Sequence, residues 1–125
     1  MRLGIALAIL YVSVDLAPLV NPRLAPVAHE LAEPAHLGLT HVMATFACAT
    51  FMRVGAARAR FAPAYFLSGG ALLFLSRLLL LAGLWGLAFP LQSVGAGLLL
   101  VGWFALAWAA AEVDNGRPAG PTAKS

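Results

Sequence analysis

Charged residues are scarce in this chain. Lysine, arginine, aspartate and glutamate make up 10% of its 125 residues, whereas 62% are hydrophobic. Soluble domains average about 25% charged residues, so the polar side chains here cannot cover a water-facing globule. Most of the eight basic residues lie at the ends of apolar segments and form no basic face, which argues against a nucleic-acid partner.

Cysteine and catalytic motifs are scarce as well. Cys48 is the only cysteine and lies inside an apolar segment, which predicts a helix-packing role and excludes an intramolecular disulfide. The sequence has no Gly-x-Ser-x-Gly elbow, no phosphate-binding loop and no dinucleotide fingerprint. Ser68, Ser76 and Ser93 are interpreted as small helix-contact residues. We therefore expect a protein that is not an enzyme.

Hydrophobic residues gather in four long segments. These cover residues 3–20, 35–52, 62–84 and 91–111. About 20 apolar residues cross a bilayer as a helix, so the sequence predicts an all-α, four-helix transmembrane bundle over residues 1–112. The polar residues 113–125 predict a disordered cytoplasmic tail. Residues 21–34 are polar and interrupted by prolines, which predicts a connection with at most a short interfacial helix.

The first segment could also serve as a signal peptide, because Arg2 precedes a short apolar run. Asp15 inside the run is unusual for such a peptide, and no clear small-x-small cleavage site follows. We therefore expect the segment to be retained as a membrane span.

The distribution of basic residues predicts the orientation. With four spans, one side of the membrane holds Arg2, Arg53, Arg58, Arg60, Arg117 and Lys124. The other side holds only Arg23. Because basic residues are retained on the cytoplasmic side, both termini are expected in the cytoplasm of a cell with this protein in its inner membrane.

A few polar residues interrupt the apolar segments, and all lie in the half of the bilayer expected to face outward. They are Asp15, His41, Arg77 and Gln92. An ionised group inside a span costs about 2.5–3.5 kcal/mol, so Asp15 and Arg77 are predicted to form an ion pair, with His41 and Gln92 completing its hydrogen bonds. Three alternatives stay open: a structural pair, a proton-relay or ligand site, and an Arg77 that reaches the outer headgroups without meeting Asp15.

Metal and haem sites are not expected. His29, Glu33 and His36 are spaced four and three residues apart, which on a helix would place possible zinc ligands on one face. Pro34 disfavours a continuous helix through this stretch, and no fourth ligand is evident. His41 has no partner histidine in another span, so it does not indicate haem either.

Three stretches resemble a family of small bacterial inner-membrane proteins known as domain of unknown function 423. They are Leu39-Thr40-His41-Val42-Met43-Ala44, Gly70-Ala71-Leu72-Leu73-Phe74, and Val94-Gly95-Ala96-Gly97 followed by Gly102-Trp103. The resemblance implies the same four-helix layout and membrane location, and it carries His41 over as a polar position. At the end of the first segment, Val14-Asp15-Leu16-Ala17-Pro18 departs from the family pattern, so this chain resembles a divergent member.

The expected function is that of a non-enzymatic membrane protein, without a cofactor, that associates with itself or with a larger membrane complex. Small residues repeated four apart support close helix contacts in lipid, as at Ala44 and Cys48 or Ala105 and Ala109. The alternative is a small oligomeric transporter or channel that uses the Asp15, His41 and Arg77 layer. An enzyme acting on lipid or quinone has no specific residue pattern in its favour.

Overall fold

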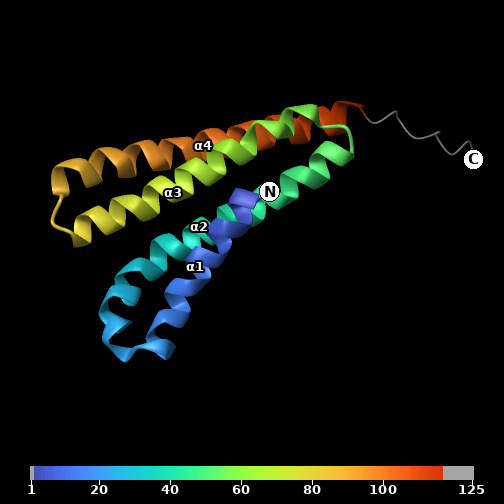
Figure 1. Cartoon of the computed structure of the whole chain (residues 1–125). Helices are drawn as coiled ribbons and strands as arrows, with labels where there is room; N and C mark the ends of the chain where they lie inside the picture. The colour runs from blue at the N-terminus through green and yellow to red at the C-terminus, as the bar shows by residue number, and fades with distance from the viewer. Residues whose placement is uncertain (1, 117–125) are drawn as a thin grey trace, which may run out of the picture.

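The computed structural model describes residues 2–116 and consists of four α-helices and two short 3-10 helices (Figure 1). In chain order these are α1 (Arg2–Val20), η1 (Pro22–Leu24), α2 (Ala25–Arg53), η2 (Ala57–Arg60), α3 (Ala62–Leu81) and α4 (Trp85–Gly116). The described residues contain no strand, so the predicted all-α class is confirmed. We call the end of the molecule with η1 and the α3–α4 turn the η1 end, and the opposite end the η2 end.

The turns follow from local residue chemistry. Asn21 ends the first hairpin arm, and its side-chain Oδ1 accepts a hydrogen bond from the Arg23 backbone N–H at 3.1 Å. Gly55 and Gly83 adopt φ angles of +101° and +78°, which residues with a Cβ rarely adopt, and they reverse the chain after α2 and α3. The helices therefore run alternately up and down.

Each helix packs mainly against its neighbours in the sequence. The α2–α3 contact joins two hairpins, α1–α2 and α3–α4, whereas α1 and α4 make no contact within the described part of the chain. Figure 1 shows the hairpins close together toward the η2 end and diverging toward the η1 end. The bundle is therefore open and does not close into a four-cornered ring.

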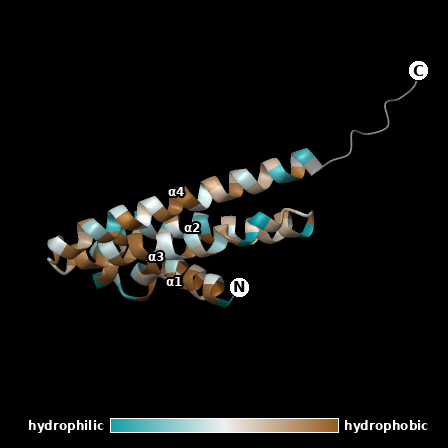
Figure 2. Cartoon of the chain, turned by 90° about the horizontal axis from the view of Figure 1, so that it is seen from above, coloured by the Kyte–Doolittle hydropathy of each residue, from teal (hydrophilic) through white to brown (hydrophobic). Residues whose placement is uncertain are grey.

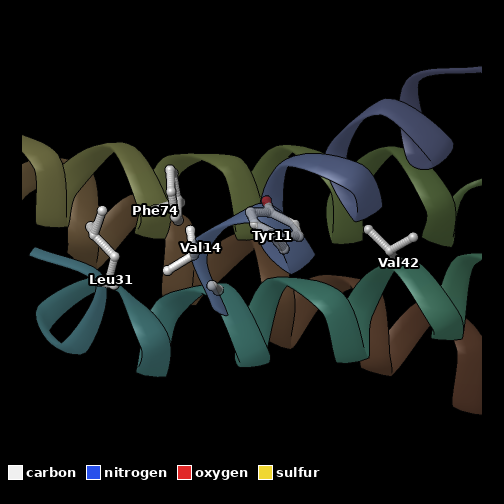
Figure 3. Close-up of a cluster of buried hydrophobic side chains, with 7 residues drawn as sticks. Tyr11, Val14, Leu31, Val42 and Phe74 are labelled. Atoms are coloured by element: carbon white, nitrogen blue, oxygen red, sulfur yellow. The ribbon is translucent and has the colours of Figure 1, made fainter. Parts of the chain in front are cut away.

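Two apolar clusters form the core. The first lies among α1, α2 and α3 and includes Tyr11, Val14, Leu31, Val42 and Phe74 (Figure 3). The second lies toward the η2 end and includes Cys48, Ala59, Phe66, Leu99 and Ala109. Cys48 is fully buried, in agreement with a packing role.

Glycines bring the helix backbones close together. A Cβ built on Gly38 of α2 would lie 2.5 Å from the Tyr11 ring, and one built on Gly69 of α3 would lie 2.9 Å from the Gly95 carbonyl oxygen of α4. Contacts this short leave room only for hydrogen, as in the close helix packing of membrane proteins.

Four described helical stretches are long and apolar enough to cross a membrane, namely 2–20, 22–53, 57–81 and 85–113. Figure 2 shows hydrophilic residues mostly toward the ends of the helices. Three of the helices end at other residues than the apolar segments expected from the sequence. The second span was expected over 35–52, but α2 begins at Ala25 and continues through Pro34. The third and fourth, expected over 62–84 and 91–111, are Ala62–Leu81 and Trp85–Gly116.

The expected tail, residues 113–125, is only partly described. Residues 113–116 continue α4 and are helical, which corrects the expectation of disorder there. Residues 117–125 lie outside the part of the chain that the structure describes.

Candidate functional site

Two polar pairs link three helices near the η1 end. The Asp15 carboxylate of α1 lies 2.8 Å from His36 Nε2 of α2, and the Arg77 guanidinium of α3 donates to Glu30 Oε2 of α2 at 2.7 Å. The predicted Asp15–Arg77 pair is therefore corrected, because each of its members has a different partner on α2. Residues 25–34, which had been assigned to a polar connection, supply Glu30 as the partner of Arg77.

Pro34 explains why Arg77 reaches this point of α2. Proline has no backbone N–H, so it cannot donate to the carbonyl oxygen four residues earlier, which belongs to Glu30. Arg77 Nε donates to that same Glu30 carbonyl oxygen at 3.2 Å. One guanidinium thus binds the backbone carbonyl and the side chain of a single residue. A helix in an apolar environment tolerates proline when another group donates to the carbonyl oxygen that proline leaves without a donor.

A small cleft adjoins these pairs between α2, α3 and the start of α4. Its volume is about 120 Å³, and it is lined by Glu33, Pro34, Leu37, Leu73, Ser76, Arg77, Leu80 and Gln92. A second, open hollow beside it shares Glu33 and Arg77 and is also lined by His29, Glu30 and His36. Arg77 and Gln92 of the expected polar layer therefore meet at one cavity. Asp15 and His41 do not line it.

His41 lies deeper than expected. The expectation that it shares a level with Asp15 assumed a second span beginning near residue 35. Because α2 is continuous from Ala25, His36 stands at the level of Asp15, and His41 is five residues, or about 7–8 Å, further from the η1 end. His41 is 5% exposed and belongs to the interior.

The hydrogen bonds of His41 define its proton arrangement. Nδ1 lies 2.7 Å from the Leu37 carbonyl oxygen, which can only accept, so Nδ1 carries a proton. The Trp103 indole N–H of α4 donates to Nε2 at 3.1 Å, so Nε2 carries none. Phe66 of α3 packs against both rings, with centroids 5.5 Å from His41 and 5.1 Å from Trp103. These three side chains join α2, α3 and α4 below the cleft.

His29, Glu33 and His36 do share the hollow, because α2 continues through Pro34. No group of three His, Cys, Asp or Glu residues among positions 2–116 is arranged to hold a metal ion. His36 pairs instead with Asp15.

The sequence reasoning missed three polar contacts: Glu30 with Arg77, His36 with Asp15, and Trp103 with His41. The first two contacts could have been predicted. Once the helix is extended past Pro34, Glu30 and His36 are ionisable residues near the levels of Arg77 and Asp15. Trp103 carried a weaker signal in the Gly102-Trp103 pair, which alone indicates nothing about His41.

Comparisons with known proteins bring no relative. No family model, curated protein or solved structure matches this chain. The resemblance to the domain of unknown function 423 family stays a prediction.

Proposed function

We propose that this chain is an inner-membrane protein with four spans and both termini in the cytoplasm. It acts without catalysis by associating with itself or with a larger membrane complex. The four long apolar helices support insertion. The basic residues Arg53, Arg58 and Arg60 at the η2 end support a cytoplasmic η2 end, since the other turns carry only Arg23.

The proposal of association depends mainly on one observation: the bundle is open, and its polar pairs are about half exposed. Asp15 and Arg77 lie five and four residues, about 6–8 Å, from the η1 ends of the apolar helices α1 and α3. The Asp15 and His36 side chains are 47% and 62% exposed, and those of Arg77 and Glu30 are 39% and 47% exposed. Charged groups exposed on the sides of apolar helices require polar surroundings, which a protein partner supplies better than hydrocarbon does.

The test is the mass of the particle purified in mild detergent, measured by light scattering after size exclusion. We expect a multiple of the 13.0 kDa chain or a larger complex. Arg77→Gln is expected to shift the particle toward the monomer, whereas Arg23→Gln, which removes a charge from η1, leaves the mass unchanged. Helix content from circular dichroism confirms that both variants fold. A lone monomer of the unaltered protein would refute the proposal.

A second candidate, a small transporter or channel, has the cleft in its favour. With Arg53 at the cytoplasmic boundary, about 20 residues of α2 cross a 30 Å core and reach Glu33, so the cleft would open to the outer aqueous phase. The His41, Phe66 and Trp103 contacts block a path beyond it, so transport requires them to separate. In a Cys48→Ser background, Gln92→Cys should react with a membrane-impermeant thiol reagent from outside. Absence of reaction would exclude this function.

A further inference from the structure

An apolar groove with an arginine side chain at one end lies between α3 and α4 at the η2 end, away from the cleft described above. Its volume is about 400 Å³, within the roughly 300–1,000 Å³ typical of ligand sites. The lining residues are Arg58, Phe61, Tyr65, Val101, Phe104, Ala105 and Trp108. Val101 and Trp108 are seven residues apart on α4, so the groove runs about 10 Å along the helix.

Arg58 of η2 is held at the mouth of this groove. Its guanidinium carbon stands 4.7 Å from the centre of the Trp108 ring, which fixes the side chain by a cation–π contact. This contact uses no hydrogen-bond acceptor, so the N–H groups of the guanidinium remain available for one. Among the side chains that the structure describes, Arg58 forms no ion pair. Arg60 stands in the same way over Phe61, at 4.7 Å, and adds a second positive charge nearby.

The charge and shape of the groove are complementary to one kind of occupant. The walls are apolar and aromatic, and Phe104 and Trp108 are 74% and 64% exposed, so the groove is accessible from the side of the bundle. Arg58 lies near the ends of the helices. In a membrane protein this is the level of the phospholipid phosphates, where tryptophan side chains are also common. A soluble phosphate would engage Arg58 but leave the apolar walls uncovered.

We infer that this groove binds an anionic phospholipid of the cytoplasmic leaflet, with the phosphate on Arg58 and one acyl chain along Phe104 and Val101. This inference rests on the proposed membrane insertion and on a cytoplasmic η2 end. Basic pockets at the cytoplasmic ends of membrane helices suit anionic headgroups for the same reason. The site lies away from the cleft of Glu33, Arg77 and Gln92, and it needs neither association nor transport.

The test is native mass spectrometry of the full chain in mild detergent, titrated with phosphatidylglycerol or with phosphatidylcholine of the same acyl chains. We expect phosphatidylglycerol adducts to be retained several-fold better. Arg58→Gln should reduce this preference about five-fold, the effect of one basic residue near an anionic membrane surface. Phe104→Ala, at an exposed position, should weaken phosphatidylglycerol retention while leaving Arg58 in place. Arg23→Gln, which removes a charge from the η1 end, is the matched control and should change nothing.

Other arms separate the remaining explanations. Glycerol phosphate without acyl chains should not bind, and its binding at Arg58 with equal strength would show an anion site in place of a lipid site. Equal retention of the two lipids by the unaltered protein, a preference unchanged in Arg58→Gln, or phosphatidylglycerol retention unchanged in Phe104→Ala would overturn the inference. Resistance of the protein to alkaline extraction from membranes is measured in parallel. Extraction would refute membrane insertion itself, whereas an integral protein without lipid preference would refute only the groove.

Discussion

Alanine at Gly69 should destabilise the protein, because the backbones of α3 and α4 approach closely at this glycine. A Cβ at this position would lie 2.8 Å from Leu99 Cδ2 and 2.9 Å from the Gly95 carbonyl oxygen. The Leu99 side chain can rotate, but the carbonyl belongs to the α4 backbone, so the helices must move apart. Overpacking of this kind costs about 1–3 kcal/mol.

Gly97 offers the matched comparison. A Cβ there meets no atom within 4 Å, so Gly97→Ala introduces the same methyl group without a clash. Both substitutions gain up to about 1 kcal/mol from the higher helix propensity of alanine. The propensity gain cancels in the difference between the two variants, which isolates the overpacking cost of about 1–3 kcal/mol.

Unfolding in mixed micelles of mild detergent and SDS, followed by circular dichroism, measures this difference. Gly97→Ala should be as stable as the unaltered protein or slightly more stable, and Gly69→Ala less stable than both. If the two variants differ by less than about 0.5 kcal/mol, the close α3–α4 packing described here is incorrect.

The same unfolding assay tests four other features of the polar and buried groups. In double-mutant cycles with glutamine or asparagine, Glu30 and Arg77 should couple by about 0.5–1 kcal/mol, whereas coupling between Asp15 and Arg77 should be near zero; the reverse ranking would restore the direct Asp15–Arg77 pair. Trp103→Phe keeps an aromatic ring but leaves His41 Nε2 without its donor, and a loss of about 1–3 kcal/mol is expected; an unchanged stability would contradict the hydrogen bond. Tyr11→Phe removes a buried hydroxyl that has no hydrogen-bond partner within residues 2–116, so stability should hold or rise by about 1 kcal/mol, and a clear loss would reveal a missed partner. Pro34→Ala restores a donor for the Glu30 carbonyl, so Arg77→Gln should cost less in that background than in the original protein.

Much of the fold was predictable because it depends on composition. Four long apolar runs separated by short stretches with proline, glycine or charged residues indicate four antiparallel helices without any knowledge of tertiary contacts. The boundary between the third and fourth helices was harder to predict from composition. The expected segments left residues 85–90 between the third and fourth helices, but these residues belong to α4, because residues 82–84 suffice to reverse the chain.

The polar site was less predictable, and Pro34 is the reason. Proline inside a helix usually ends or kinks it, since a carbonyl loses its hydrogen bond. That rule holds for an isolated helix, but here a side chain 43 residues later in the sequence supplies the missing donor. Because α2 begins at residue 25 and not near residue 35, the histidine at the level of Asp15 is His36 and not the expected His41. Only the tertiary structure contains this information.

The link between Arg77 and Glu30 also has a consequence for biogenesis. Under the proposed membrane insertion, α1 and α2 are synthesised, and can enter the bilayer, before α3 exists. Until α3 arrives, the Glu30 carbonyl lacks both its helical donor and Arg77, and the first hairpin carries an unsatisfied acceptor together with an unpaired carboxylate. In the proposed membrane protein, the first hairpin is therefore an incomplete intermediate until the second hairpin is synthesised.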